Sequence, residues 1–272
     1  MQASADWVPP SGTLGRIIEE TRRRLLSIEA PTEATQSRST AGHRPSLRQA
    51  LSRDTVAVIA EVKRRSPSKG SLNPTIDAAA QALAFERGGA AAISVLTEPS
   101  HFGGSIQDLV DVSAATRVPV LKKDFHLERA QVAEAVRGGA SALLLIARAL
   151  PPEQLAQMLD AARRLDIEAV VEVRDEAELE CALSVGANIV GVNSRNLETL
   201  DVDERIPERL MPLLPTDVIG IWESGVRGLD DVRRAAAAGA DAVLVGSALS
   251  QSADPETLVR SMTRVDRKQR RG

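Results

Sequence analysis

The chain has 272 residues, of which 43% are hydrophobic and 26% are charged, and its formal net charge is −3. A chain of this size can bury a sizeable core in one large domain or two small ones. Only 2% of its residues are aromatic, which argues against a stacking surface for single-stranded nucleic acid. The net charge gives no general attraction to polyanions.

The sequence also argues against a membrane or secreted protein. No apolar run approaches the roughly 20 residues of a membrane span, and the first residues lack the basic and apolar regions of a signal peptide. The single cysteine, Cys181, can form no internal disulfide and is predicted to be a buried thiol on a helix. We therefore expect a cytoplasmic protein with no nucleic-acid or membrane partner.

The first 50 residues differ in sequence pattern from the rest of the chain. Residues 11–27 are predicted to form a helix, because a serine can cap it and apolar residues recur at helical spacing. Residues 29–45 are polar and poor in large apolar side chains, which is typical of a mobile connection. We assign residues 1–50 to an N-terminal helical extension, residues 51–264 to a catalytic domain, and residues 265–272 to a basic, solvated tail.

Eight short β-rich runs alternate with helix-like segments through the rest of the chain. The runs begin at residues 55, 91, 118, 142, 168, 189, 218 and 242. Eight strand–helix units in succession predict a parallel (β/α)8 TIM barrel. The rival is a doubly wound open sheet, which usually has fewer strands and a glycine-rich turn after the first strand. Here the first run leads into "RRSPSKG", which has no GxGxxG pattern.

A glycine–alanine signature recurs before alternate runs and supports the barrel. Its copies start at Gly88, Gly138, Gly186 and Gly239. A glycine there can end a helix in the left-handed conformation, and the alanine allows a tight entry into the next strand. Recurrence every two strand–helix units indicates a quasi-repeated barrel.

Polar residues end several of the runs on the face expected to point into the barrel. In the first run, Glu61 and Lys63 share a face with Ala57 and Ile59, because side chains alternate along a strand. The same alternation brings four more polar residues to the same rim: Lys123, Glu172, Asn193 and Glu223. A stabilising ring of ion pairs is the alternative, but confining so many charges in one cavity is costly unless they are used. Barrel active sites are assembled in this way.

The last two runs end in a different kind of loop. The seventh leads into Ser224 and Gly225, and the eighth leads into Gly246 and Ser247. Glycine lets backbone N–H groups approach an anion, and in barrels this pair of loops often holds phosphate. Lys63 and Ser66 can add contacts from the first strand, which neighbours the eighth in a closed barrel.

The chemistry that fits these residues is proton transfer on a reactive sugar phosphate. Carboxylates, lysines and an amide surround the predicted phosphate pocket, with glutamate as base and lysine as acid. The histidines, His43, His101 and His126, show no metal-ligand spacing. The chain also has no nucleophile elbow, P-loop or dinucleotide fingerprint. We therefore expect no metal and no cofactor, and a substrate that is itself a reactive carbonyl or enamine.

These residues, in this order, resemble the indole-3-glycerol phosphate synthase family, a lyase family of tryptophan biosynthesis. The matching stretches are "AEVKRRSPSKG", "VLTEPSHFGGS", "PVLKKDF", "VVEV", "GVNSRNLETL", "ESGV" and "VLVGSAL". The resemblance spans about residues 11–262 and implies ring closure, decarboxylation and dehydration of 1-(2-carboxyphenylamino)-1-deoxyribulose 5-phosphate. It also implies a monomer that can associate with other enzymes of the tryptophan pathway.

The resemblance implies a role for each site residue. Lys123 is implied as general acid in ring closure and Glu172 as acid/base in dehydration, while Glu61 and Lys63 position the anthranilate portion. Either Lys63 or Lys123 can polarise an oxygen. The implied binding residues are Asn193 and Glu223 for the hydroxyls and the developing amine, Phe102 and Phe125 for the aromatic ring with Arg195 beside them, and Ser66, Ser224, Gly225, Gly246 and Ser247 with Lys63 for the phosphate. The N-terminal helix is implied to help cover the site.

One residue departs from the family pattern, and three other interpretations stay open. Family members usually carry a small residue at Trp222, which we expect to face the helices and to alter packing there. A class I aldolase would form a Schiff base on a barrel lysine. A phosphoribosylanthranilate isomerase would use a cysteine and an aspartate, whereas Cys181 lies on a predicted helix. A paralogue that binds a sugar phosphate without turnover is the remaining alternative.

Overall fold

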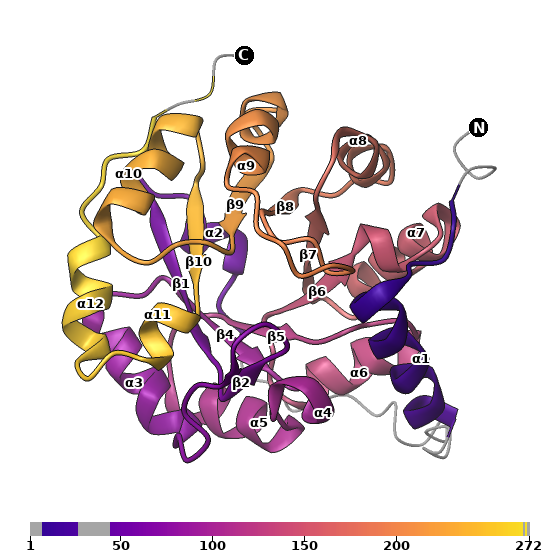
Figure 1. Cartoon of the computed structure of the whole chain (residues 1–272), viewed down its shortest axis with the longest axis horizontal. Helices are drawn as coiled ribbons and strands as arrows, with labels where there is room; N and C mark the ends of the chain where they lie inside the picture. The colour runs from indigo at the N-terminus through magenta and orange to yellow at the C-terminus, as the bar shows by residue number, and fades with distance from the viewer. Residues whose placement is uncertain (1–6, 27–43, 269, 271–272) are drawn as a thin grey trace.

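The computed structural model describes residues 7–26, 44–268 and 270, and these confirm the predicted TIM barrel (Figure 1). Most of the predicted mobile connection lies outside the described residues. Eight parallel strands close into one barrel, with the first strand paired to both the second and the last. The strands are β1 (Ala57–Val62), β4 (Ala92–Leu96), β5 (Val120–Lys123), β6 (Ala142–Ile146), β7 (Glu168–Val173), β8 (Ile189–Asn193), β9 (Ile219–Glu223) and β10 (Ala242–Val245).

Helices surround the barrel and connect successive strands (Figure 1). The larger ones are α3 (Ala78–Gly88), α5 (Ile106–Ala115), α6 (Arg129–Arg137), α7 (Pro152–Arg164), α8 (Glu176–Ser184), α9 (Arg205–Leu210), α10 (Leu229–Ala238) and α12 (Pro255–Met262). Short elements sit in the loops: α4 (Pro99–Phe102), α11 (Ser247–Ser250), the 3-10 helices η2 (Ala147–Ala149) and η3 (Met211–Leu213), and a hairpin of β2 (Arg65–Ser66) and β3 (Gly70–Ser71). Side-chain caps fix several helix starts, as Asp77 does for α3 and Ser105 for α5.

Each glycine–alanine signature contains a left-handed glycine, which is the second glycine in the two copies that start at Gly88 and Gly138. Gly89, Gly139, Gly186 and Gly239 have φ values of 96°, 83°, 82° and 89°. A side chain at these positions would strain the backbone, so glycine lets each helix end and the chain turn at once into the next strand.

Two helices outside the repeating units pack at opposite ends of the barrel. α1 (Gly12–Leu26) lies at the C-terminal mouth, where Thr13 N donates to Glu198 O at 2.9 Å. α2 (Leu47–Leu51) lies at the N-terminal end, where Ser46 Oγ donates to Glu168 Oε1 at 2.9 Å. The predicted N-terminal helix is therefore confirmed, and it lies where it can cover a site at the mouth.

The C-terminal segment packs against the barrel, although the sequence predicted a solvated tail there. The side chains of Arg267 and Arg270 contact buried Asp241, at 2.6 and 2.8 Å. Val56 N also donates to Val265 O at 2.8 Å, which holds the segment against the start of β1. The prediction of a solvated tail is wrong for these two arginines, because the aspartate at the start of β10 attracts them to the barrel floor.

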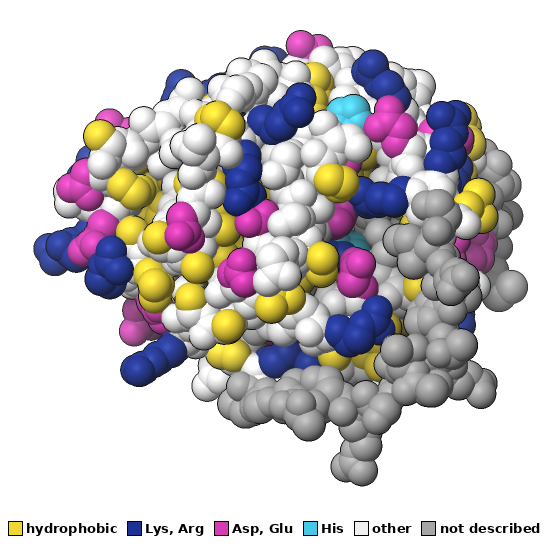
Figure 2. All heavy atoms as spheres, turned by 90° about the horizontal axis from the view of Figure 1, so that it is seen from below, with side chains coloured by type: hydrophobic (Ala, Val, Ile, Leu, Met, Phe, Trp, Pro, Cys, Tyr) yellow, Lys and Arg dark blue, Asp and Glu magenta, His cyan; other side chains and the backbone are white. Residues whose placement is uncertain are grey.

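The outer surface carries charges of both signs. On the face seen in Figure 2, basic and acidic side chains of the described residues are interspersed rather than gathered by sign. None of the helices described for this chain is long and apolar enough to span a bilayer.

Candidate active site

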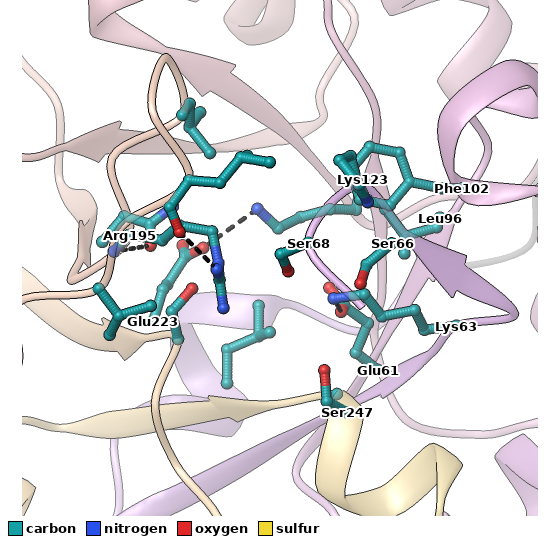
Figure 3. Close-up of a pocket in the computed structure, with 18 of the residues that line it drawn as sticks. Glu61, Lys63, Ser66, Ser68, Leu96, Phe102, Lys123, Arg195, Glu223 and Ser247 are labelled. Carbon is teal, nitrogen blue, oxygen red and sulfur yellow. Dashed lines mark hydrogen bonds and ion pairs between the residues drawn. The ribbon is translucent and has the colours of Figure 1, made fainter. Parts of the chain in front are cut away.

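The polar residues predicted to meet at the barrel mouth line one cavity of about 520 Å³ (Figure 3). The prediction that they converge is confirmed for all six: Glu61, Lys63, Lys123, Glu172, Asn193 and Glu223. Strand register explains the convergence. Asn193 on β8 is paired with Glu223 on β9, and Glu172 on β7 is paired with Gly191, the preceding inward-facing residue of β8, so all three side chains enter the same end of the barrel.

Lys123 lies at the centre of the charged group. Its Nζ is 2.9 Å from Glu172 Oε2 and 3.1 Å from Glu223 Oε2. Asn193 Nδ2 donates to the other oxygen of Glu172 at 2.9 Å. These bonds hold the lysine and the first carboxylate in one orientation, as general acid–base catalysis requires.

Burial and neighbouring charges move the pKa values of Lys123, Glu172 and Glu223 away from their ordinary values. Burial alone would lower the pKa of Lys123, but the charges of Glu172, Glu223 and Glu61 raise it above its ordinary value. Burial would likewise raise the pKa of Glu172, but the Lys123 charge and the Asn193 hydrogen bond hold it below its usual range. Burial, with the charge of Glu172, raises the pKa of Glu223 to about 8, although Lys123 acts in the opposite direction. At neutral pH the site therefore holds an ammonium, a carboxylate and a neutral carboxylic acid.

Two glycines make room for the buried carboxylates. A Cβ on Gly191 would collide with Glu223 Oε1, and a Cβ on Gly246 would collide with Glu61 Oε1. Glu61 accepts a hydrogen bond from Lys63 Nζ at 3.0 Å. Gly246 was predicted as a phosphate contact, and its lack of a side chain also lets Glu61 occupy the barrel interior.

An apolar wall faces the charged group. The rings of Phe102 and Phe125 are 6.2 Å apart between centroids and tilted by 39°. Lys63 Nζ lies 6.0 Å from the Phe102 centroid. Leu14 and Ile17 of α1 line the same cavity, so the N-terminal helix contributes to the wall. A flat aromatic ring fits such a wall with its charged substituents toward the lysines.

The loops predicted to hold phosphate lie on the same cavity. Ser224 and Gly225 follow β9 with φ values of 65° and 80°, and Ser247 follows β10. Ser224 and Gly225 therefore form a tight left-handed turn at the edge of the cavity, where the glycine lets an anion approach the backbone closely. Figure 3 shows Ser247, Lys63 and Ser66 on the same side of the cavity.

The sequence analysis missed further residues in the loop after β1. Ser68 and Lys69 lie between β2 and β3 and line the cavity. Both stand within "AEVKRRSPSKG", so the motif could have indicated them. Arg64 anchors this loop, because its two terminal nitrogens contact the carboxylate of Asp108 on α5 at 2.5 and 2.8 Å.

Arg195 lines the cavity and is held by its own loop. Its backbone N–H donates to Asn193 Oδ1 at 2.9 Å, and its Nη1 donates to Leu200 O at 2.8 Å. Burial lowers the pKa of Arg195. The aromatic wall predicted beside Arg195 is present, and the hydrogen bonds of Arg195 are made to its own loop.

Trp222 and Cys181 both lie outside the cavity. Trp222 is buried on the helix-facing side of β9, and the Arg234 guanidinium on α10 is 6.0 Å from its ring, as expected from alternation. Cys181 lies on α8 as predicted, but it is half-buried rather than fully buried. It does not line the cavity, which argues against the isomerase alternative.

Comparisons with known proteins agree with this geometry. The family described as indole-3-glycerol phosphate synthase matches residues 14–262. An enzyme of that name from Nocardioides sp. is 52% identical over 210 residues, covering 77% of this chain and 81% of that protein. Another from Mycobacterium ulcerans is 46% identical over 253 residues, covering 92% and 93%.

More distant solved structures share the fold alone. A 3-hexulose-6-phosphate synthase has a TM-score of 0.62 at 16% identity, covering 76% of this chain and 98% of that chain. A thiamine phosphate pyrophosphorylase from Pyrococcus furiosus has a TM-score of 0.57 at 15% identity, covering 77% and 94%. The family match and the two closely similar relatives together show that the chain belongs to the indole-3-glycerol phosphate synthase family.

Proposed function

We propose that the cavity at the barrel mouth converts 1-(2-carboxyphenylamino)-1-deoxyribulose 5-phosphate to indole-3-glycerol phosphate, with loss of carbon dioxide and water. This is the carboxy-lyase reaction of the family in tryptophan biosynthesis. The observation that carries the proposal is the placement of Lys123 between Glu172 and Glu223, in one cavity with an aromatic wall and the phosphate loops.

Lys123 is the proposed general acid of ring closure. Its ammonium donates to the ribulose carbonyl oxygen while the aryl carbon attacks the carbonyl carbon, so negative charge forms beside a fixed cation. Phe102 and Phe125 hold the ring during attack, and Lys63, near Phe102 and Glu61, orients the anthranilate portion. Loss of carbon dioxide then leaves its bonding electrons in the ring system and restores aromaticity.

Glu172 is the proposed acid/base of dehydration. It is ionised at neutral pH because its pKa is lowered, so it can take up the proton that is lost as the indole double bond forms. Glu223 keeps a proton to about pH 8 and can donate a hydrogen bond to the departing hydroxyl. Asn193 fixes the orientation of Glu172 through the bond to its second oxygen.

The phosphate is proposed to bind between the loops after β9 and β10, with Ser66 and Lys63 on the side of β1. Ser224, Gly225, Gly246 and Ser247 supply backbone and hydroxyl donors there. Because the phosphate end of the substrate is held in these loops, away from Glu172, the other end of the substrate faces the acid–base group.

The same proposal covers how the chain is organised. Residues 51–264 are the catalytic domain, residues 1–50 extend from it and contribute α1 to the site, and residues 265–272 are a basic C-terminal segment whose Arg267 and Arg270 contact the barrel floor. We propose a cytoplasmic monomer that can associate with other enzymes of the pathway.

The direct test is an absorbance assay for indole formation with the purified chain and the carboxyphenylamino substrate. We expect indole-3-glycerol phosphate as product, and absence of indole absorbance would contradict the proposal. Borohydride trapping with a ketose phosphate tests the aldolase alternative, in which Lys123 would become covalently labelled. Schiff-base formation needs a neutral amine, and the surrounding carboxylates favour the ammonium, so we expect no labelling.

A further inference from the structure

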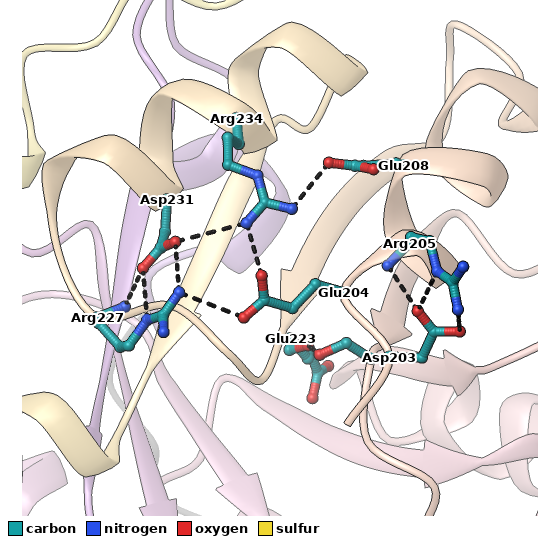
Figure 4. Close-up of polar contacts among 9 residues, drawn as sticks. Asp203, Glu204, Arg205, Glu208, Glu223, Arg227, Asp231 and Arg234 are labelled. Atoms are coloured by element: carbon teal, nitrogen blue, oxygen red, sulfur yellow. Dashed lines mark hydrogen bonds and ion pairs between the residues drawn. The ribbon is translucent and has the colours of Figure 1, made fainter. Parts of the chain in front are cut away.

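Five charged side chains join the loop after β8 to the loop after β9 on the outer side of the phosphate end (Figure 4). They are Glu204, Glu208, Arg227, Asp231 and Arg234. We call this set the outer network. Its members come from two stretches of the chain, residues 204–208 and 227–234, and two of them, Glu204 and Arg227, also line the cavity.

Glu204 links the outer network to the phosphate end of the cavity. Its Oε2 accepts from Arg234 Nη1 at 2.6 Å, and its Oε1 accepts from Arg227 Nη2 at 3.3 Å. A Cβ built on Gly225 would lie 3.6 Å from both Cγ and Oε1 of Glu204, which is ordinary van der Waals contact. The glutamate stem therefore packs against the glycine that turns the loop.

The two arginines are themselves held in place. Arg227 contacts Asp231 in the first turn of α10, through Nε at 3.2 Å. Arg234, in the second turn of α10, also donates to Glu208 at 2.9 Å, and its guanidinium lies 6.0 Å from the Trp222 ring centroid. Trp222 precedes Glu223 in β9, so the side chain that departs from the family pattern packs against the outer network.

The loop needs support from its surroundings. Ser224 has a φ of 65°, a conformation that a non-glycine residue keeps only when neighbouring structure holds it. A carboxylate against the loop would also repel a bound phosphate unless cations neutralise it, and two arginines contact Glu204.

We propose that Glu204 and Arg234 are positioning residues that hold the loop of Ser224 and Gly225 in its phosphate-binding conformation. The inference rests on the proposed function, because that function assigns phosphate to this loop. Glu204 packs against the loop, and Arg234 fixes and neutralises Glu204. The outer network thus acts on the affinity for the phosphate end of the substrate and leaves the acid–base chemistry at Lys123 and Glu172 unchanged.

The test compares Arg234→Ala and Glu204→Ala with Arg233→Ala. Arg233 is next to Arg234 on α10, and its ion pair with Asp230 is exposed at 63% and 91% of the two side chains, so it is a matched control. We expect KM for the substrate to rise about tenfold in the first two variants while kcat stays within about twofold, because ground-state and transition-state binding of phosphate fall together. Arg233→Ala should match the wild type.

Binding of inorganic phosphate, followed by calorimetric titration, gives a readout that does not depend on turnover. The Kd for phosphate should rise in parallel with KM, and Arg234→Lys, which keeps the charge, should recover part of the loss. Unchanged KM and phosphate affinity in both alanine variants would overturn the proposal, and so would a fall in kcat alone. If the wild type binds phosphate but forms no indole, the proposed function fails while the phosphate titration still tests the loop.

Thermal unfolding of each variant separates a local effect from a loss of fold. Where Glu204→Ala unfolds early, Glu204→Gln replaces it, because glutamine keeps the stem against Gly225 and removes only the charge. The proposal then predicts a smaller rise in KM for Glu204→Gln than for Arg234→Ala, and the reverse order would contradict it.

Discussion

Gly191 on β8 leaves the space that Glu223 on β9 occupies, because a Cβ on Gly191 would overlap Glu223 Oε1. The two residues lie on paired strands, and Glu223 Oε1 has no hydrogen-bond partner among the described residues. The Glu223 carboxyl group thus contacts Lys123 through Oε2, and its Oε1 fills the space that Gly191 leaves open.

Gly191→Ala should displace Glu223 while the barrel remains folded. Because the methyl group and Glu223 Oε1 cannot occupy the same space, the carboxyl must rotate away from Lys123. We expect kcat/KM to fall by about 10- to 100-fold, which is typical of a misplaced catalytic group. Steady-state kinetics and thermal unfolding of the same preparation measure the two effects.

Gly228→Ala is the matched control for that substitution. A Cβ on Gly228 would meet nothing within 4 Å, and its φ of −177° suits any residue. Its kinetics should match the wild type. Equal losses in both variants would show that the effect of Gly191→Ala does not arise from contact with Glu223.

The raised pKa of Glu223 predicts an alkaline limb in the pH–rate profile. Glu223 loses its proton as the pH passes about 8, so kcat/KM should fall above that pH, where the carboxyl can no longer donate to a hydroxyl. Glu223→Gln keeps a donor at every pH and should remove this limb, although its maximal rate will be lower. A limb of unchanged position in Glu223→Gln would assign it to another group.

The same pKa makes a prediction about stability. The folded pKa of Glu223, about 8, lies above the value of an unfolded glutamate, about 4.3. Between these values the folded state holds a proton that the unfolded state has released, so the contribution of Glu223 to the free energy of unfolding falls as pH rises through the window. Denaturant unfolding at a series of pH values should show less loss in Glu223→Gln than in the wild type.

Asp241 should be important for stability rather than for catalysis. Its carboxylate contacts Arg267, Arg270 and the Gly220 N–H at the barrel floor, and its side chain is only 6% exposed. Removing its charge leaves the nearly buried Arg270 without its ionic partner, so Asp241→Asn should lower the free energy of unfolding by about 3 kcal/mol.

Asp230→Asn serves as the surface comparison for Asp241→Asn. Asp230 is 91% exposed in its pair with Arg233, and its loss should change the free energy of unfolding by less than about 0.5 kcal/mol. Urea unfolding of both variants gives the numbers, and similar small changes would mean that the arginines do not stabilise the barrel floor through Asp241.

The residues that could be predicted from the sequence share one physical basis. Alternation along a strand places every second side chain inside a closed barrel. That rule placed Lys123 inside and Trp222 outside, and the structure agrees with both. The eight strands followed from the same local pattern, because each buried run is short and bounded by helix and turn signals.

Contacts between loops could not be predicted in the same way. Glu204 and Arg234 are separated by 30 positions, and no local periodicity links a loop carboxylate to an arginine on the next helix. The C-terminal arginines were expected in solvent, since a charge run contains no information about a partner such as Asp241. Such pairs depend on the tertiary packing that brings the segments together.

The central claim is that Lys123 is the acid of ring closure, and the neighbouring lysine provides its control. Lys122 points to the outer side of β5, where its fully buried Nζ contacts Glu134 at 2.5 Å, while Lys123 points into the cavity. The most direct measurement is kcat for indole formation by Lys123→Ala and Lys122→Met, expressed per folded protein. We predict a fall of about a thousandfold or more for Lys123→Ala and a kcat within about threefold of the wild type for Lys122→Met. A kcat for Lys123→Ala near that of the wild type would contradict the account.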